Sequence, residues 1–150
     1  IVDYTSRLHY SSDWLYEMTC LNFLEDITKE KGGIPFPNKV SFISQNWKKY
    51  PALIQDSTLV TKIIDIEKTI NGGLLLYPER KSTPFRGQIK TGDIILITTK
   101  KKGLDTAHVG IAIENEGQIY LLHASVSDKK VSITTENSLI TYNESHHIPA

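Results

Sequence analysis

Cysteine is nearly absent from this sequence of 150 residues, which contains only Cys20. One thiol cannot form a disulfide within the chain, and there is no cysteine cluster or zinc-ligand spacing, so neither a disulfide framework nor a metal site is predicted. Net charge is absent as well, because 17 lysines and arginines balance 17 aspartates and glutamates. Without an excess of positive charge, we do not expect nucleic acid as a partner.

Long apolar runs are also missing. No stretch approaches the length that crosses a bilayer, and no basic segment followed by an apolar one opens the chain, so no membrane span is expected. The sequence lacks the Gly-x-Ser-x-Gly motif of many serine hydrolases. Its length suits one sizeable core, and we expect residues 1–150 to form a single domain.

The first half of the chain carries helical patterns. Apolar residues at helical spacing predict a helix from 12 to about 31, or two short helices broken near Asn22. A second amphipathic helix is predicted from 56 or 57 to 72, where glycines follow. Between them we expect an extended passage over 40–43 and a short irregular or helical turn over 47–53, ended by its proline.

The second half changes to short runs rich in β-forming residues. Predicted strands cover residues 74–77, 93–98, 108–114, 118–123 and 130–134. The turn-forming residues between the third and fourth runs predict an antiparallel hairpin. Helices followed by a sheet indicate the α+β class.

Two histidines mark the predicted hairpin, because His108 opens one strand and His123 closes the next. Antiparallel pairing lets them approach side by side, one as a general base and the other holding its tautomer. On this pattern alone, a structural histidine pair is the commoner case. Ser125 shares a strand face with His123 and could line the same cleft.

A mixed polar segment, residues 6–14, leads into the first predicted helix. Its basic, aromatic and acidic side chains suit a ligand with amides, sugars and a carboxylate, whereas the structural alternative is a capped helix start with Trp14 in the core. Asp13 and Glu17, one helical turn apart, suggest a glycosidase acid pair, but such spacing is common on solvated helix faces. The only thiol, Cys20, lies inside the predicted helix rather than at its start, so we interpret it as buried or incidental.

Several blocks taken together resemble the bacterial N-acetylmuramoyl-L-alanine amidase-like proteins, within the NlpC-like, papain-fold group of cell-wall cysteine hydrolases. The resemblance covers essentially the whole chain. Its blocks are Tyr4-Thr5-Ser6-Arg7-Leu8-His9-Tyr10 with Asp13-Trp14, Gly92-Asp93-Ile94-Ile95, Leu104-Asp105-Thr106-Ala107-His108-Val109-Gly110-Ile111-Ala112, and Leu121-Leu122-His123-Ala124-Ser125 with Val131 and Tyr142.

The resemblance implies a papain-like fold, with N-terminal helices packed on a C-terminal antiparallel sheet. It implies that His108 is the catalytic base and His123 the orienting member of a Cys-His-His triad. Residues expected to bind substrate are Arg7, His9, Tyr10, Asp13, Trp14 and Ser125. The substrate is peptidoglycan or muropeptides, cut next to the muramoyl lactyl group or within the stem peptide. No cofactor is implied, and the place of action is extracytoplasmic, in the periplasm or cell envelope.

The catalytic cysteine of this family lies in an Asp-Cys block upstream of the Ser-Arg-Leu-His-Tyr block, and Cys20 does not match it. We therefore expect that residues 1–150 are the C-terminal two-thirds of a longer hydrolase domain, inactive without the upstream segment. The alternative is a catalytically inactive protein that binds peptidoglycan. A glycoside hydrolase using paired carboxylates ranks below both.

Overall fold

The computed structural model describes residues 3–36, 39–73, 76–77 and 87–135. Its chain separates into two compact units. Unit 1 comprises residues 1–79 with 100–105, and unit 2 comprises 80–99 with 106–150. The segment between two strands of unit 2 therefore belongs to unit 1. The expectation of a single domain stays a prediction.

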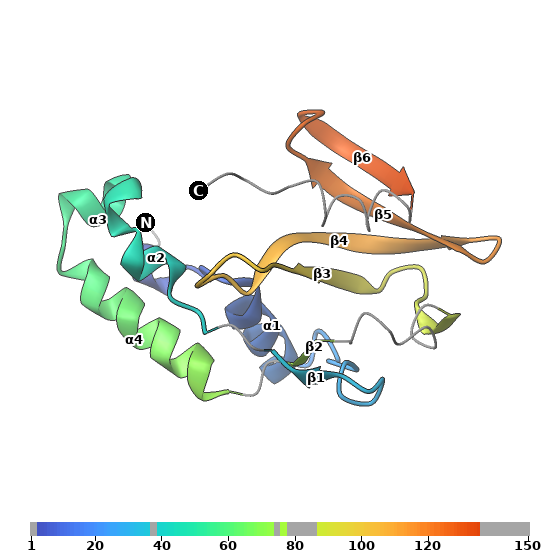
Figure 1. Cartoon of the computed structure of the whole chain (residues 1–150), viewed down its shortest axis with the longest axis horizontal. Helices are drawn as coiled ribbons and strands as arrows, with labels where there is room; N and C mark the ends of the chain where they lie inside the picture. Colours follow the sequence, from blue (N-terminus) through green and yellow to red (C-terminus); the bar gives the residue numbers. More distant parts are fainter. Residues whose placement is uncertain (1–2, 37–38, 74–75, 78–86, 136–150) are drawn as a thin grey trace. The chain divides into compact units, whose positions relative to one another are not determined.

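Unit 1 contains short helices and one longer helix (Figure 1). Its two 3-10 helices are η1 (Tyr4–Ser6) and η2 (Trp47–Lys49); its α-helices are α1 (Ser11–Cys20), α2 (Phe42–Gln45), α3 (Pro51–Gln55) and α4 (Leu59–Gly72). Two strands of two residues, β1 (Ile34–Pro35) and β2 (Leu76–Tyr77), pair antiparallel. The buried apolar centre is formed by Tyr10, Val40, Ile43, Leu53 and Ile63.

The prediction of α4 is confirmed, since its wide apolar face reaches the core of unit 1 through Ile63 and its neighbours. At its start, the carboxylate of Asp56 accepts hydrogen bonds from the backbone amide and the hydroxyl of Thr58, at 3.0 and 2.6 Å. These bonds form an Asx turn that leads the chain into the helix.

The predictions for residues 12–55 need three corrections. The first helix ends at Cys20, and Asn22 takes a left-handed conformation with φ 57°, so the break is where expected but no second helix follows over 23–31. Residues 40–43 are not extended throughout, because α2 begins at Phe42. Pro51 begins α3 rather than ending a turn; proline tolerates a first helical position, where its missing N–H is not needed.

Unit 2 contains an antiparallel sheet of β3 (Ile94–Thr98), β4 (Thr106–Asn115), β5 (Gln118–Ser125) and β6 (Lys130–Thr135), in that spatial order (Figure 1). The predicted hairpin is confirmed as β4 and β5. The four strands match the predicted runs from 93 onward, while of the run 74–77 only β2 lies within the described residues. Helices with an antiparallel sheet confirm the mixed class; the packing of helices on the sheet stays a prediction.

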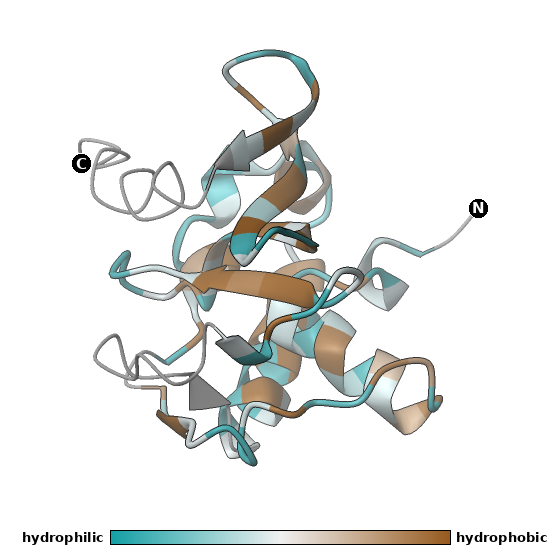
Figure 2. Ribbon diagram, turned by 90° about the vertical axis from the view of Figure 1, so that its right-hand side faces the viewer, coloured by the Kyte–Doolittle hydropathy of each residue, from teal (hydrophilic) through white to brown (hydrophobic). Residues whose placement is uncertain are grey.

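The two faces of this sheet differ sharply in exposure. Ala112, Ile119, Leu121, His123 and Ser125 share one face and are buried. The other face carries a row of paired apolar residues that crosses all four strands, and Figure 2 shows brown, hydrophobic bands along these strands. The row is Ile94, Ile111, Leu122 and Ile133.

Candidate active site

The two predicted histidines meet on the sheet of unit 2. Nε2 of His108 lies 2.7 Å from Nδ1 of His123, a hydrogen bond in which either ring can be the donor. The rings stand nearly perpendicular, at 86°, with centroids 4.8 Å apart. His123 is buried and His108 is half-buried. The sequence-based expectation that these side chains approach across the hairpin therefore matches the geometry.

The strand register explains why both rings stand on the buried face. Ile111 pairs with Leu122, and both point to the exposed face. His108 lies three residues before Ile111 and His123 one residue after Leu122, so strand alternation places both imidazoles on the opposite face. A β-bulge adds one residue to β4 beside His108, because Ile97 pairs with His108 but Thr98 pairs with Thr106. Bulges of this kind re-aim side chains near functional sites.

Gly110 supports the same pair from within β4. It is buried, two residues from His108, and a Cβ atom there would overlap the side chain of Leu121. Leu121 is itself fully buried and lies two residues before His123 in β5. The absence of a side chain at Gly110 therefore leaves room for Leu121 on the sheet face that carries the two histidines.

Ser125 lies two residues beyond His123 on the same buried face. Its hydroxyl oxygen is 3.1 Å from that of Ser127 and accepts a bond of 3.1 Å from the backbone amide of Asp128. A separate hydrogen bond, between the side chains of Ser125 and Asp128, is the largest cause that lowers the pKa of Asp128 from its usual value. Ser125 thus orders the turn after β5; its contact with substrate stays a prediction.

The predicted substrate-binding residues at the N-terminus all belong to unit 1. Arg7 is exposed, with its guanidinium 5.9 Å from the ring centre of Tyr4. His9 is half-buried and its Nε2 lies 2.8 Å from the carbonyl oxygen of Tyr4. Trp14 is half-buried in the first turn of α1. How this segment lies relative to His108 stays a prediction.

Tyr10 occupies the core rather than a surface. It is 4% exposed; its hydroxyl donates to Oε1 of Glu67 at 2.7 Å and accepts from the backbone amide of Ile43 at 2.8 Å. The same Glu67 oxygen accepts from the amide of Ser44 at 3.0 Å. Burial, with the Glu67 carboxylate as a further contributor, raises the pKa of Tyr10 well above its usual value. These contacts give Tyr10 a structural role, and its predicted contact with substrate stays a prediction.

Asp13 is half-buried in the first turn of α1. Burial raises the pKa of its carboxyl group, and the charges of Glu17 and Asp105 act in the same direction. A backbone hydrogen bond and the charge of His9 act in the opposite direction. Glu17 is exposed whereas Asp13 is half-buried, so the two carboxylates proposed as a glycosidase pair differ in their exposure to solvent.

Asp105 is a buried polar residue whose role sequence reasoning missed. Its Oδ2 accepts hydrogen bonds from the backbone amide and the hydroxyl of Ser12, at 2.7 and 2.8 Å. Asp105 is 2% exposed and ties the start of α1 to a segment 93 positions later in the chain. A carboxylate at a helix N-terminus is electrostatically favourable. No local sequence pattern predicts this contact, because the carboxylate comes from a distant part of the chain.

Cys20 is exposed and is the last residue of α1. Of the two interpretations, buried or incidental, burial is wrong, whereas the position of Cys20 away from a helix start is confirmed. A hydrogen bond with Cys20 raises the pKa of Tyr16 beside it. Within the described residues there is no group of three or more histidine, cysteine or acidic side chains that could hold a metal. Nor does that part of the chain contain a helix long and apolar enough to cross a membrane.

The family profile of AmiA-like, N-acetylmuramoyl-L-alanine amidase-like proteins matches residues 1–148, and the chain belongs to this family. An N-acetylmuramoyl-L-alanine amidase of Bacteroides uniformis is 35% identical with a TM-score of 0.84, over 94% of this chain and 61% of that one. A Bacteroides fragilis protein, provisionally described as a xylanase, is 35% identical with a TM-score of 0.81, over 94% of this chain and 63% of that one. No curated protein matches significantly. The chain thus spans less than two thirds of these solved structures.

Proposed function

We propose that this chain is the base-bearing part of a cysteine-type peptidoglycan amidase with a papain-like, NlpC-like fold. The hydrogen bond between His108 and His123 carries the proposal, because a base oriented by a further group is the arrangement that activates a thiol nucleophile. Membership of the amidase-like family supports peptidoglycan or muropeptides as substrate. Since peptidoglycan lies outside the cytoplasmic membrane, the proposed place of action is the periplasm or cell envelope.

The hydrogen bond supports separate roles for the two ring nitrogens of His108, one held by His123 and the other reacting with the thiol. Nε2 of His108 is bonded to His123, so the proposed reacting atom is Nδ1 of His108. Nδ1 takes the proton of the cysteine thiol, and the thiolate attacks the amide carbonyl. Collapse of the tetrahedral intermediate breaks the C–N bond, and His108 gives its proton to the leaving amine. Water then hydrolyses the thioester, returning carboxylate product and thiol.

The nucleophile is proposed to come from a segment outside residues 1–150. The position of Cys20 at the C-terminal end of α1 supports this, because activated cysteines are usually found at helix N-termini or beside cationic groups. The greater length of the similar solved structures leaves room for such a segment.

The test uses the complete gene product, whose intact mass and rapidly alkylated thiols are measured near neutral pH. We expect a second, fast-reacting thiol and the release of stem peptide from muropeptides, followed by mass spectrometry. His108→Ala should lower turnover by about 10²–10⁴-fold while circular dichroism stays unchanged. A folded complete product with no hydrolysis, or with Cys20 as its only thiol, would contradict the amidase.

A non-catalytic peptidoglycan-binding protein is the second candidate, favoured by the position of Cys20 at the end of α1 rather than at a helix start. It predicts muropeptide binding that survives His108→Ala, with no turnover before or after the change. The lowest-ranked candidate, a glycosidase using Asp13 and Glu17, predicts release of reducing ends that Asp13→Asn abolishes.

A further inference from the structure

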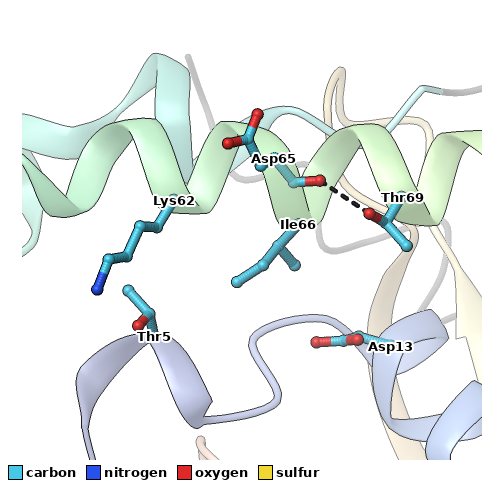
Figure 3. Close-up of a pocket in the computed structure, with 6 residues that line it drawn as sticks. All are labelled: Thr5, Asp13, Lys62, Asp65, Ile66 and Thr69. Atoms are coloured by element: carbon cyan, nitrogen blue, oxygen red, sulfur yellow. Dashed lines mark hydrogen bonds between the residues drawn. The ribbon is translucent and has the colours of Figure 1, made fainter.

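Unit 1 contains an open groove of about 380 Å³ between the start of α1 and α4. Figure 3 shows the residues that line it: Thr5, Asp13, Lys62, Asp65, Ile66 and Thr69. The groove combines both signs of charge with an aliphatic side chain. The mechanism proposed above uses none of these side chains in a chemical step.

Opposite charges face the groove from its two sides. The carboxylate of Asp13 extends from α1 toward the space below α4, and the ammonium group of Lys62 extends down from α4 beside Thr5 (Figure 3). The side chain of Ile66 lies between them. In contrast, the carboxylate of Asp65 turns away from Asp13 and pairs with Lys68 at 2.9 Å.

Both charged groups are suited to a ligand. Burial raises the pKa of Asp13, so its ionised form lacks part of the hydration that a ligand cation would replace. Lys62 lies 3.9 Å from Asp3 in a pair whose side chains are 59% and 58% exposed. Such an exposed pair contributes little and exchanges readily for another carboxylate.

The two hydroxyl groups at the groove present lone pairs. The Thr5 hydroxyl donates to Asp3 at 3.0 Å, and the Thr69 hydroxyl donates to the backbone oxygen of Asp65 at 3.0 Å. With their protons committed, both oxygens act toward a ligand only as acceptors. Thr69, on the side of the groove that carries Asp13, can accept from a ligand's ammonium group, whereas Thr5 lies beside Lys62 at the other side (Figure 3).

We propose that this groove binds a short peptide with a free ammonium group at Asp13 and a free carboxylate at Lys62, its aliphatic part lying on Ile66. The biological relevance rests on the proposed function, since fragments of peptidoglycan stem peptides carry such ends. Recognition of the peptide does not depend on the proposed function, because it consists of a charge-assisted hydrogen bond at each end of the peptide and an apolar contact in the middle.

The probes are alanine, dialanine and trialanine, which carry the same two charges at increasing separation, titrated into the isotope-labelled chain by NMR. We expect one length to bind best, with shifts at Asp13, Lys62 and Ile66. Its N-acetylated and C-amidated forms should bind about tenfold more weakly or worse. Absence of binding by all three, or equal binding of the capped forms, would overturn the proposal.

Matched variants locate the two contacts. Asp13→Asn and Lys62→Met should each weaken the best peptide by about tenfold or more. Their controls, Glu30→Gln in an exposed turn and Lys68→Met on α4, make the same charge changes at side chains that do not line the groove and should leave affinity unchanged. If the controls weaken binding equally, the effect is general electrostatics and the proposed site is wrong. Hydrolysis by the complete gene product is measured separately, so either proposal can fail alone.

Discussion

His108 and His123 share one hydrogen bond of 2.7 Å across a strand pair, with their rings nearly perpendicular. One proton occupies that bond, so the tautomer of one ring dictates the tautomer of the other. The buried ring of His123 thereby determines which nitrogen of His108 carries the proton, and with it the protonation of Nδ1, the nitrogen proposed to react. This relationship links the local strand register to the proposed chemistry.

His123 is expected to act by positioning His108. In the complete gene product, His123→Ala should lower kcat by about 10–100-fold, less than His108→Ala, and leave KM nearly unchanged. His123→Asn, which can still hydrogen-bond, should recover part of kcat. Equal losses in the alanine and asparagine variants, or a loss confined to KM, would contradict a positioning role.

Gly110→Ala should destabilise the sheet because the added Cβ meets Leu121. Overpacking of this kind costs about 1–3 kcal/mol, measured as a lower midpoint of urea unfolding. The control is Gly87→Ala, where no atom lies within 4 Å of the added Cβ. If the contact is the cause, Gly110→Ala should cost less in a Leu121→Ala background than in the original chain.

Tyr10→Phe should destabilise unit 1 by about 1–3 kcal/mol, because the backbone amide of Ile43 and the buried carboxylate of Glu67 lose a partner. The matched change Tyr16→Phe removes a hydroxyl from a side chain that is 66% exposed. It should change the free energy of unfolding by less than about 0.5 kcal/mol. Equal effects of the two changes would show that the buried network contributes nothing.

Asp13→Asn should stabilise the chain at neutral pH. Because folding raises the pKa of Asp13 above its usual 3.8, its ionised form costs stability, and this cost is present above the folded pKa and absent below 3.8. Solvent screening limits the gain to about 1 kcal/mol or less, or about 2–4 °C in Tm. Thermal unfolding at pH 7 and pH 3 measures it, with Asp65→Asn as control. A gain that persists at pH 3 would exclude ionisation as its origin.

The exposed apolar row on the sheet predicts that the 150-residue chain self-associates. Val131 and Ile133 on this face are 68% and 60% exposed. Ile133→Lys should shift sedimentation toward monomer, because burying a lysine without a partner is costly. The control Ile54→Lys, on α3 at 56% exposure, should leave association unchanged. A chain that is monomeric at high concentration would contradict the prediction.

Helix α4, the strands from residue 93 onward and the histidine pair were predictable because they follow short-range rules. Period and turn chemistry place α4 and the β4–β5 hairpin, and strand alternation places His108 and His123 on one face. The region between Cys20 and Pro51 was less predictable. Its apolar residues fit a helix locally, but the backbone of Asn22 reverses to positive φ and ends the pattern.

The sequence by itself determined the class of fold, the family and the two histidines, since periodic patterns and ordered motifs depend on neighbours in the chain. Tertiary structure alone decided which polar groups are buried and what they contact. Asp105 reaches Ser12 over 93 positions, and Tyr10 reaches Glu67 over 57. The physical reason is that desolvation and hydrogen-bond geometry depend on distances in space, which no local pattern specifies.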